Sequence, residues 1–147
     1  MGDRNRARLS ERSLMKGHYR ILLVDDDPDV LMTMVDVLES RGYEVVTARD
    51  GEEALENLKE EKPDLMILDL LMPRMDGFEV CKTLQDPSWS DYSNMPIMIL
   101  TAVSEGASHR RYQLETGRTI DAHDYLEKPV DIQLLSDRVA KLIRVSE

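Results

Sequence analysis

The chain has 147 residues, a formal net charge of −10 and one cysteine. This length suits one domain with a single core that needs no disulfide or metal for stability. One cysteine cannot close an internal disulfide, and no Cys/His spacing is typical of a zinc site. The sequence contains no apolar run of about 18 residues and no signal-peptide pattern at its start. We therefore expect a cytoplasmic protein without a membrane span.

Charge is unevenly distributed along the chain. Residues 1–20 hold six Lys and Arg residues against two acidic residues, whereas the remainder is strongly acidic. An acidic surface disfavours direct binding to nucleic acid. We expect residues 1–18 to form a basic, disordered tail and residues 19–147 to form the folded domain. Binding of this tail to an anionic partner or a membrane surface is the less favoured alternative.

Short apolar runs predict strands that alternate with helices. Three of these runs are almost continuously apolar, which is typical of parallel strands buried on both faces. The predicted strands are residues 20–24, 43–47, 64–69, 96–101 and 124–128.

The predicted helices follow the strands in turn. Pro28 is typical of a first helical turn, and Asp50 with Glu53 resembles a capping box. The expected helices are residues 28–41, 50–62, 76–85 and 131–143, with the segment 104–123 fitting one helix and a loop. Five such strand–helix units predict a doubly wound α/β fold with helices on both faces of a parallel sheet.

Polar residues stand at the predicted carboxyl ends of the strands. Residues 25–27, all aspartate, follow the first strand, Asp69 ends the third, Thr101 ends the fourth and Lys128 follows the fifth. In doubly wound sheets, functional groups gather at this edge. Capping of the next helix would explain one aspartate, but three facing a fourth favour a site.

Carboxylates and a carbonyl are the ligands that Mg²⁺ prefers. Asp26 and Asp69, with a backbone carbonyl near Leu71 and several waters, would complete its octahedral coordination. A divalent cation would also make the cluster of like charges tolerable. The sequence therefore predicts a magnesium site at this edge of the sheet.

Four motifs occur in order along the chain: VDDDPDV, LDLLMPRMDG, ILTA and YLEKPV. In these motifs residues 19–145 resemble the receiver domain of two-component response regulators. The resemblance implies a flavodoxin-like (CheY-like) three-layer fold with strand order 2-1-3-4-5. It also implies a phosphoacceptor signalling domain, not an enzyme in the usual sense, that binds Mg²⁺ and receives phosphate from a sensor histidine kinase or phosphotransfer protein.

The resemblance also assigns roles to individual residues. Asp69 becomes the phosphoacceptor and Lys128 its ammonium partner, while Asp25 and Asp26 become the acidic pair, with Asp26 binding the metal directly and Asp25 through water. A carboxylate is a weak nucleophile, so the reaction depends on positioning and charge neutralisation. Thr101 becomes the switch hydroxyl.

Tyr125, three residues before the lysine, becomes the aromatic residue that moves with Thr101. The alternative is that Tyr125 is only a half-buried aromatic residue on an edge strand. Movement of Thr101 and Tyr125 would alter the surface formed by 104–123, the last strand and the last helix. This surface would bind a downstream protein effector or form a phosphorylation-dependent dimer, unless the protein is a monomer. No DNA-binding domain follows in this chain, which predicts a single-domain regulator.

Leu71 and Val103 flank the expected approach of a hydrolytic water to the phosphorylated aspartate. Neither side chain can orient water, which predicts slow self-dephosphorylation. His109 and His123 are expected to be ordinary surface residues. Asp121, Ala122 and His123 replace the small Gly-Ala pair of the family, and 101–128 is about five residues longer than usual, so a lengthened loop is expected there.

Two other classes of protein share part of this pattern. A phosphohydrolase with an aspartate nucleophile would need a second acid where Leu71 stands. A binding module that is never phosphorylated would lack part of the set formed by the acidic pair, Asp69, Thr101 and Lys128, yet all of these are present. A phosphorylated response regulator is therefore the favoured interpretation.

Overall fold

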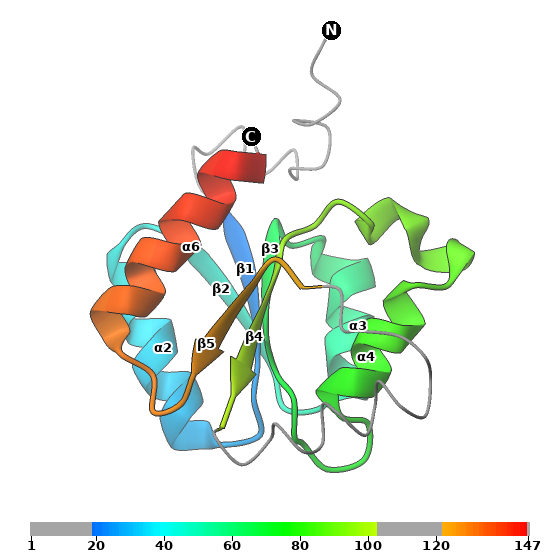
Figure 1. Ribbon diagram of the computed structural model, residues 1–147, viewed down its shortest axis with the longest axis horizontal. Helices are drawn as coiled ribbons and strands as arrows, with labels where there is room; N and C mark the ends of the chain where they lie inside the picture. The colour runs from blue at the N-terminus through cyan, green and yellow to red at the C-terminus, as the bar shows by residue number, and fades with distance from the viewer. Residues whose placement is uncertain (1–18, 103–121, 147) are drawn as a thin grey trace, which may run out of the picture.

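The structure, a computed structural model, describes residues 19–102 and 122–146 (Figure 1). Its central layer is one parallel sheet with the order β2-β1-β3-β4-β5. The predicted doubly wound fold and strand order are thus confirmed. The strands are β1 (Arg20–Val24), β2 (Glu44–Ala48), β3 (Leu65–Asp69), β4 (Ile97–Thr101) and β5 (Asp124–Glu127). The helices are α2 (Pro28–Ser40), α3 (Gly51–Glu61), α4 (Gly77–Leu84), the 3₁₀ helix η2 (Pro87–Tyr92) and α6 (Ile132–Ser146).

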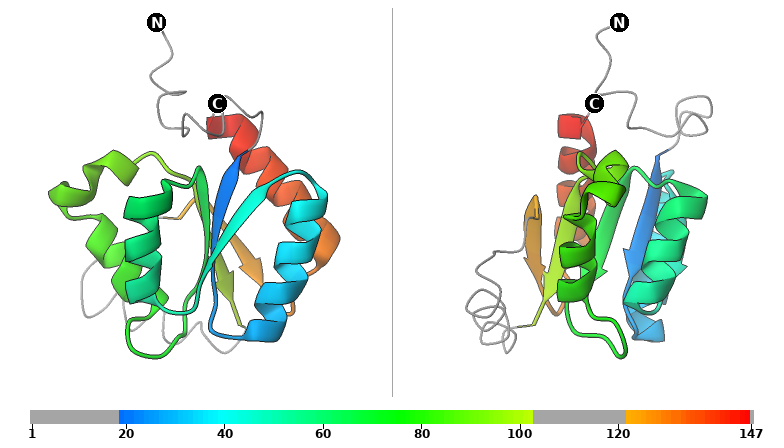
Figure 2. Two further views of the ribbon diagram at one scale, coloured as in Figure 1. Left: turned by 180° about the vertical axis from the view of Figure 1, so that it is seen from behind. Right: turned by 90° about the vertical axis from the view of Figure 1, so that its right-hand side faces the viewer.

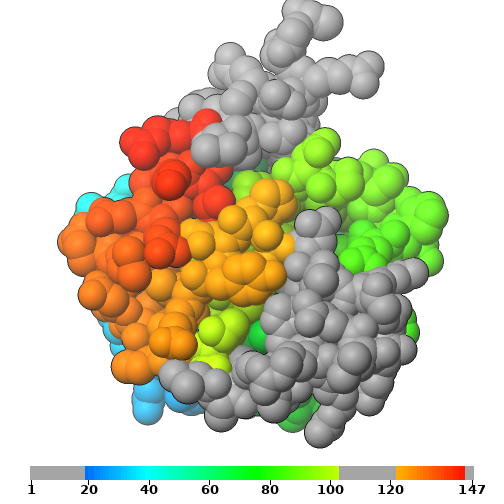
Figure 3. All heavy atoms as spheres, viewed as in Figure 1, coloured from blue at the N-terminus to red at the C-terminus, as the bar shows by residue number. Residues whose placement is uncertain are grey.

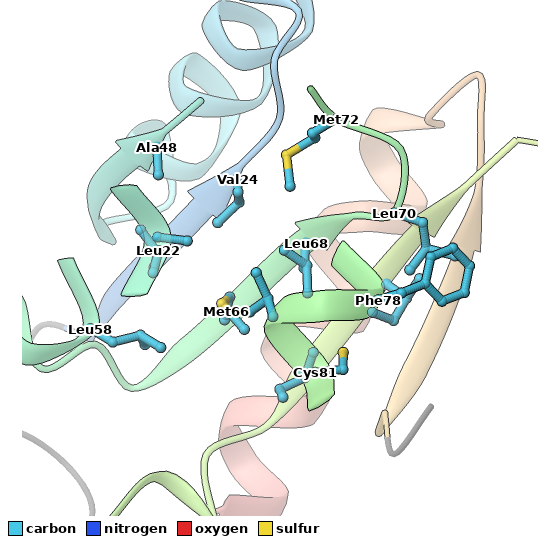
Figure 4. Close-up of a cluster of buried hydrophobic side chains, with 14 of the residues drawn as sticks. Leu22, Val24, Ala48, Leu58, Met66, Leu68, Leu70, Met72, Phe78 and Cys81 are labelled. Carbon is cyan, nitrogen blue, oxygen red and sulfur yellow. The ribbon is translucent and has the colours of Figure 1, made fainter. Parts of the chain in front are cut away.

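Helices cover both faces of this sheet (Figures 1 and 2). Alternate residues of each strand point to opposite faces, so the buried strands contribute to two cores. One core joins the sheet to α3 and α4, and Figure 4 shows it around Leu68, Leu70 and Phe78. The other joins the sheet to α2 and α6 through Leu38 and Val139, among others. The cores fix the strands, and thereby the positions of the residues at the strand ends.

The predicted boundaries agree with the structure within one residue for the strands and for α2, α3 and α4, whereas α6 ends three residues later than predicted. The helix η2 was missed, although Asp86 caps it by accepting the N–H of Ser88 (2.9 Å) and Pro87 begins it, both recognisable signals. The segment predicted at 104–123 lies almost wholly outside the described residues, as does the predicted tail 1–18.

Aspartates begin the helices that follow the strands. Asp27 accepts the N–H of Asp29 (2.9 Å) at the start of α2. Asp50 and Asp76 accept amides at 2.9 Å and 3.0 Å in α3 and α4. Asp131 accepts the N–H of Leu134 (3.0 Å) in α6. Because each cap satisfies an otherwise unpaired helical N–H, several of the acidic residues at this edge have a structural role.

Arg20, the last basic residue of 1–20, is buried at the start of β1, in agreement with the predicted strand 20–24. Its guanidinium pairs with Glu44 of β2 and with the carboxylate and carbonyl groups of Glu61 in α3. A buried charge needs such partners, so Arg20 joins three elements at the amino end of the sheet.

None of the helices among the described residues has both the length and the apolar composition that crossing a bilayer would require.

Candidate functional site

Three carboxylates meet at the carboxyl ends of β1 and β3. Asp25 and Asp26 follow β1, and Asp69 is the last residue of the neighbouring β3. One oxygen from each lies within 4.8 Å of the others. Asp25 and Asp69 are buried, whereas Asp26 is exposed. Parallel pairing of β1 with β3 therefore brings together residues that are more than 40 positions apart.

Lys128 is the cation of this cluster. Its Nζ lies 3.1 Å from Oδ2 of Asp25 and 3.2 Å from Oδ1 of Asp69. Its backbone N–H donates to the carbonyl of Thr101 (2.6 Å), which continues the pairing of β4 with β5 into the loop. Burial of the ammonium lowers the pKa of Lys128, but the charges of Asp69 and Asp25 outweigh burial and raise it above its usual value. Lys128 is thus positively charged at neutral pH.

The charges of the cluster favour a divalent cation. One ammonium faces three carboxylates, which leaves excess negative charge at a partly buried position. The exposed Asp26 gives an ion access from solvent. Carboxylate oxygens are hard ligands that suit Mg²⁺, so the donor set fits the expected metal.

The loop after Asp69 is fitted closely to the strand end. The N–H of Gly77 donates to the carbonyl of Leu70 (2.9 Å). A Cβ at Gly77 would lie 2.5 Å from the carbonyl oxygen of Asp69, so only glycine fits. Gly77 therefore allows a close backbone approach that a side chain would obstruct. Leu71 is 45% exposed, beside the acidic cluster in sequence but outside the core.

The structure places the predicted switch residues on the neighbouring strands. Thr101 is partly buried at the end of β4, one position beyond Leu100, which pairs with Asp69. Tyr125 lies on the edge strand β5, pairs with Ile99 and is 42% exposed.

Two of the remaining predicted positions, Val103 and His109, lie outside the described residues. His123 is exposed, as expected, but its Nδ1 accepts the N–H of Ile97 (3.1 Å) and its own N–H donates to the carbonyl of Ile97 (2.8 Å). It therefore helps to join the start of β5 to β4.

Sequence reasoning missed one contact within the cluster. It paired Lys128 with Asp69, whereas the ammonium lies equally close to Asp25. No spacing in the sequence indicates this second partner, because it depends on the position of the loop after β5.

Comparison with known families decides the membership of this chain. The response regulator receiver domain family matches residues 21–140. The chain belongs to this family. Receiver domains partner with histidine kinases and act as signalling phosphoacceptors rather than as enzymes. The cluster of Asp25, Asp26 and Asp69 is an acidic triad typical of the Mg²⁺ site of receivers.

Relatives of known name support the assignment. The chain is 39% identical over 128 residues to the alkaline phosphatase synthesis transcriptional regulatory protein PhoP of Bacillus subtilis, covering 87% of this chain and 50% of that protein. It is 42% identical over 125 residues to the response regulator MprA of Mycobacterium leprae, covering 85% and 51%. The chain thus spans about half the length of these curated relatives.

Solved structures show the same fold. The chemotaxis response regulator CheY4 of Vibrio cholerae superposes with a TM-score of 0.71 and 30% identity, covering 85% of this chain and 98% of that one. The signal receiver domain of a signal transduction histidine kinase from Syntrophus aciditrophicus gives a TM-score of 0.73 and 31% identity, covering 86% and 90%.

Proposed function

We propose that Asp69 accepts a phosphoryl group from a histidine kinase or phosphotransfer protein in a Mg²⁺-dependent reaction. The observation that carries the proposal is the buried Asp69 carboxylate beside Lys128 and within 4.8 Å of two further carboxylates. Mg²⁺ bound by Asp26, Asp69 and the carbonyl of Leu71, with Asp25 reached through water, would neutralise the charge of the transferred group.

The residues of the chain supply position and charge. The strand β3 and Gly77 fix the Asp69 carboxylate at the sheet edge, so its oxygen needs little reorganisation before it attacks phosphorus. The ammonium of Lys128 contacts both Asp25 and Asp69 before the reaction, and it would bind a phosphoryl oxygen after it. Transfer then forms one O–P bond at Asp69 and breaks the N–P bond of the donor histidine.

The signal would pass from Asp69 to β4 and β5. A phosphoryl oxygen on Asp69 offers an acceptor to the hydroxyl of Thr101, and Tyr125 would then exchange its exposed position for a buried one. In Figure 3, β5 and α6 form adjoining parts of one surface. We place the binding of a protein effector or a second copy of the chain on this surface.

A groove beside the acidic cluster suits the phosphodonor protein. It has a volume of about 270 Å³ and a mostly apolar lining. Lys128 contributes both to this groove and to the acidic cluster, so a protein that places an apolar side chain there also brings its histidine near Asp69. The residues that line the groove are Asp29, Val30, Thr33 and Met34 of α2, Ile132 of α6, and Lys128, Pro129 and Val130.

Acetyl phosphate tests the proposed chemistry without knowledge of the kinase. Incubation with acetyl phosphate and Mg²⁺ is expected to add one phosphoryl group to the intact chain, as measured by mass spectrometry. Asp69→Asn should remain unmodified, and chelation of Mg²⁺ should prevent the reaction. An unmodified wild-type protein would indicate a binding module, and continuous release of phosphate would indicate a phosphohydrolase; either result would contradict the proposal.

We also propose that Leu71 and Val103 make the phosphorylated state long-lived. Leu71 is exposed beside the site and offers no group that orients water. Leu71→Asn should therefore accelerate the loss of phosphate by about tenfold, because the amide can hold a water molecule by a hydrogen bond. This effect is smaller than that of a true general base. The measurement is the decay of phosphorylated protein after removal of acetyl phosphate, with Val103→Glu as a second variant. Unchanged decay in both variants would contradict this role.

A further inference from the structure

The loop after Asp69, residues 70–76, contacts the beginning of α3 in a way that the proposed chemistry does not use. The guanidinium of Arg74 in this loop pairs with the carboxylate of Asp50, the residue before α3. One residue further on, the N–H of Gly51 donates to the carbonyl of Met75 (2.8 Å). The loop that directly follows Asp69 is thus joined to another βα unit.

The two carboxylate oxygens of Asp50 contact different parts of the chain, the helix α3 and the loop 70–76. Its Oδ1 accepts the N–H of Glu53 (2.9 Å) and caps α3, while its Oδ2 faces Arg74. The hydrogen bond from Arg74 and the amide of Glu53 hold the pKa of Asp50 below its usual value, and Asp50 in turn raises the pKa of Arg74. Both members of the pair are therefore charged at neutral pH, and Asp50 is buried.

Gly51 allows the loop to approach α3 closely. A Cβ at this position would lie 2.5 Å from the carbonyl oxygen of Met75 and 2.8 Å from Cγ2 of Val80. The carbonyl is a backbone atom and cannot move aside without moving the loop. The loop and the helix are therefore fitted to each other at the backbone level.

The backbone of Arg74 is in the left-handed region, with φ of 63°. A non-glycine residue is disfavoured there because its Cβ crowds the following carbonyl group. In this conformation the loop places the mostly exposed guanidinium of Arg74 against Asp50 at the start of α3. The conformation and the pair thus depend on each other.

The contact with α3 supports the middle of the loop. At its two ends, the loop is joined to the sheet and to α4 by the N–H of Leu70, which donates to Leu100 (3.4 Å), and by the N–H of Gly77, which donates to Leu70 (2.9 Å). Between these ends, Arg74 and Met75 join the loop to the start of α3, and Asp76, its last residue, caps α4.

We propose that Arg74 and Asp50 are positioning residues that hold residues 70–76 in the conformation required for phosphoryl transfer to Asp69. The inference rests on the proposed function of Asp69. Loss of the pair should leave the loop held to α3 by the Gly51–Met75 hydrogen bond alone and so let it shift, which displaces the Leu71 carbonyl and the strand end. A small displacement of a reacting group lowers a rate strongly.

Five variants, including Arg74→Lys, separate positioning from stability. Asp50→Asn removes the charge but keeps a good helix cap. Arg74→Gln removes the other charge, and the double variant completes a thermodynamic cycle. The matched control is Arg49→Gln, which also removes one positive charge. Arg49 is exposed, and its backbone N–H, which donates to Glu53 (2.8 Å), is kept in the variant.

Each single variant is expected to be phosphorylated by acetyl phosphate about tenfold more slowly than the wild type at saturating Mg²⁺. The double variant should be no slower than the singles, and Arg74→Lys should recover part of the rate. Amide hydrogen exchange at Gly51 and Gly77 should accelerate in the variants but not in Arg49→Gln. Urea unfolding will show that every variant is folded under the assay conditions.

Wild-type rates and exchange in both single variants would overturn the inference, as would effects that multiply in the double variant. A loss of urea stability without a change in rate would reduce the pair to a structural contact and would also overturn it. Failure of the wild-type chain itself to take up phosphate would overturn the proposed function, and with it this inference, whereas a reactive wild type with normal variants would overturn the inference alone.

Discussion

At the scale of the residue, three adjacent aspartates have three different environments. Asp25 is buried, pairs with Lys128 and accepts the N–H of Asp27 (3.0 Å). Asp26 is exposed and belongs to the acidic triad, while Asp27 caps α2. The chain turns from β1 into α2 at this point, so successive side chains point to different surroundings. The sequence left two interpretations of this run, helix capping and a candidate site. Asp27 has the capping role, whereas Asp25 and Asp26 belong to the acidic triad.

Lys128 gives a prediction about stability at alkaline pH. Its pKa is raised in the folded protein because Asp69 and Asp25 outweigh the effect of burial. A raised pKa stabilises the folded state fully below the unfolded value of 10.5, and this contribution is lost as pH rises through the folded pKa. Lys128→Met should therefore be less stable than the wild type near neutral pH, and the difference should shrink at higher pH.

Urea unfolding between about pH 9 and about pH 12 measures this difference, because the difference shrinks only above the unfolded value of 10.5. Burial also raises the pKa of Tyr43 and Tyr92, which lowers the stability of both proteins at high pH and cancels in the comparison. A stability difference that stays constant over this range would show that the Lys128 ammonium is not held by the carboxylates.

At the scale of the element, the connections between strands and helices decide where the site residues lie. Capping aspartates begin α2, α3, α4 and α6, and they fix each helix at the edge where the strands end. The loop between β3 and α4 adds two close backbone approaches, at Gly51 and Gly77. The site is therefore supported by the starts of several helices, because each of them lies next to the end of a strand.

Gly77→Ala tests this support. The added Cβ would meet the carbonyl oxygen of Asp69 at 2.5 Å and the Cα of Leu70 at 2.8 Å, both in the backbone. The cost is expected to be about 2 kcal/mol in unfolding free energy, a typical value for overpacking. The rate of phosphorylation by acetyl phosphate should also fall by about tenfold, because the end of β3 must shift.

Gly42→Ala is the matched control. Gly42 has φ of 93° and no atom within 4 Å of an added Cβ. Alanine at this position therefore adopts a disfavoured backbone conformation but makes no steric clash. We expect a loss of about 1 kcal/mol in unfolding free energy and an unchanged phosphorylation rate. Equal rates for the two variants would show that the fit at Gly77 does not position Asp69.

At the scale of the whole molecule, the apolar residues form the two cores and the charged residues are left to the edges of the sheet. The buried Arg20 joins β1, β2 and α3 at the amino edge. The opposite edge collects the acidic triad and Lys128. The chain is acidic as a whole, so a divalent cation at the carboxyl edge reduces repulsion within the site and is attracted to the protein generally.

Mg²⁺ should therefore stabilise the folded protein. An ion that binds only the folded state adds about 2.7 kcal/mol to the unfolding free energy at a concentration 100 times its Kd. Asp26→Asn should lose most of this gain, yet it should be more stable than the wild type in EDTA, since one of three neighbouring carboxylates becomes neutral. Asp36→Asn, an exposed change on α2 with the same loss of charge, should retain the gain.

Thermal unfolding with Mg²⁺ and with EDTA provides the measurement. The idea of a shared cation would fail if Mg²⁺ stabilised Asp26→Asn as strongly as the wild type.

The alternation of strands and helices, the strand ends at which Asp69 and Thr101 stand, and the helix caps could all be predicted from the sequence, because these features depend on local periodicity and on short-range hydrogen bonds. The ordered motifs of the sequence also indicated the strand order through resemblance to the family. Tertiary structure alone decided that Lys128 lies between Asp25 and Asp69, that Arg20 is buried, and that Arg74 reaches Asp50. These contacts join segments 24 to 103 positions apart, and their geometry is fixed by sheet pairing and loop conformation, which local patterns do not encode.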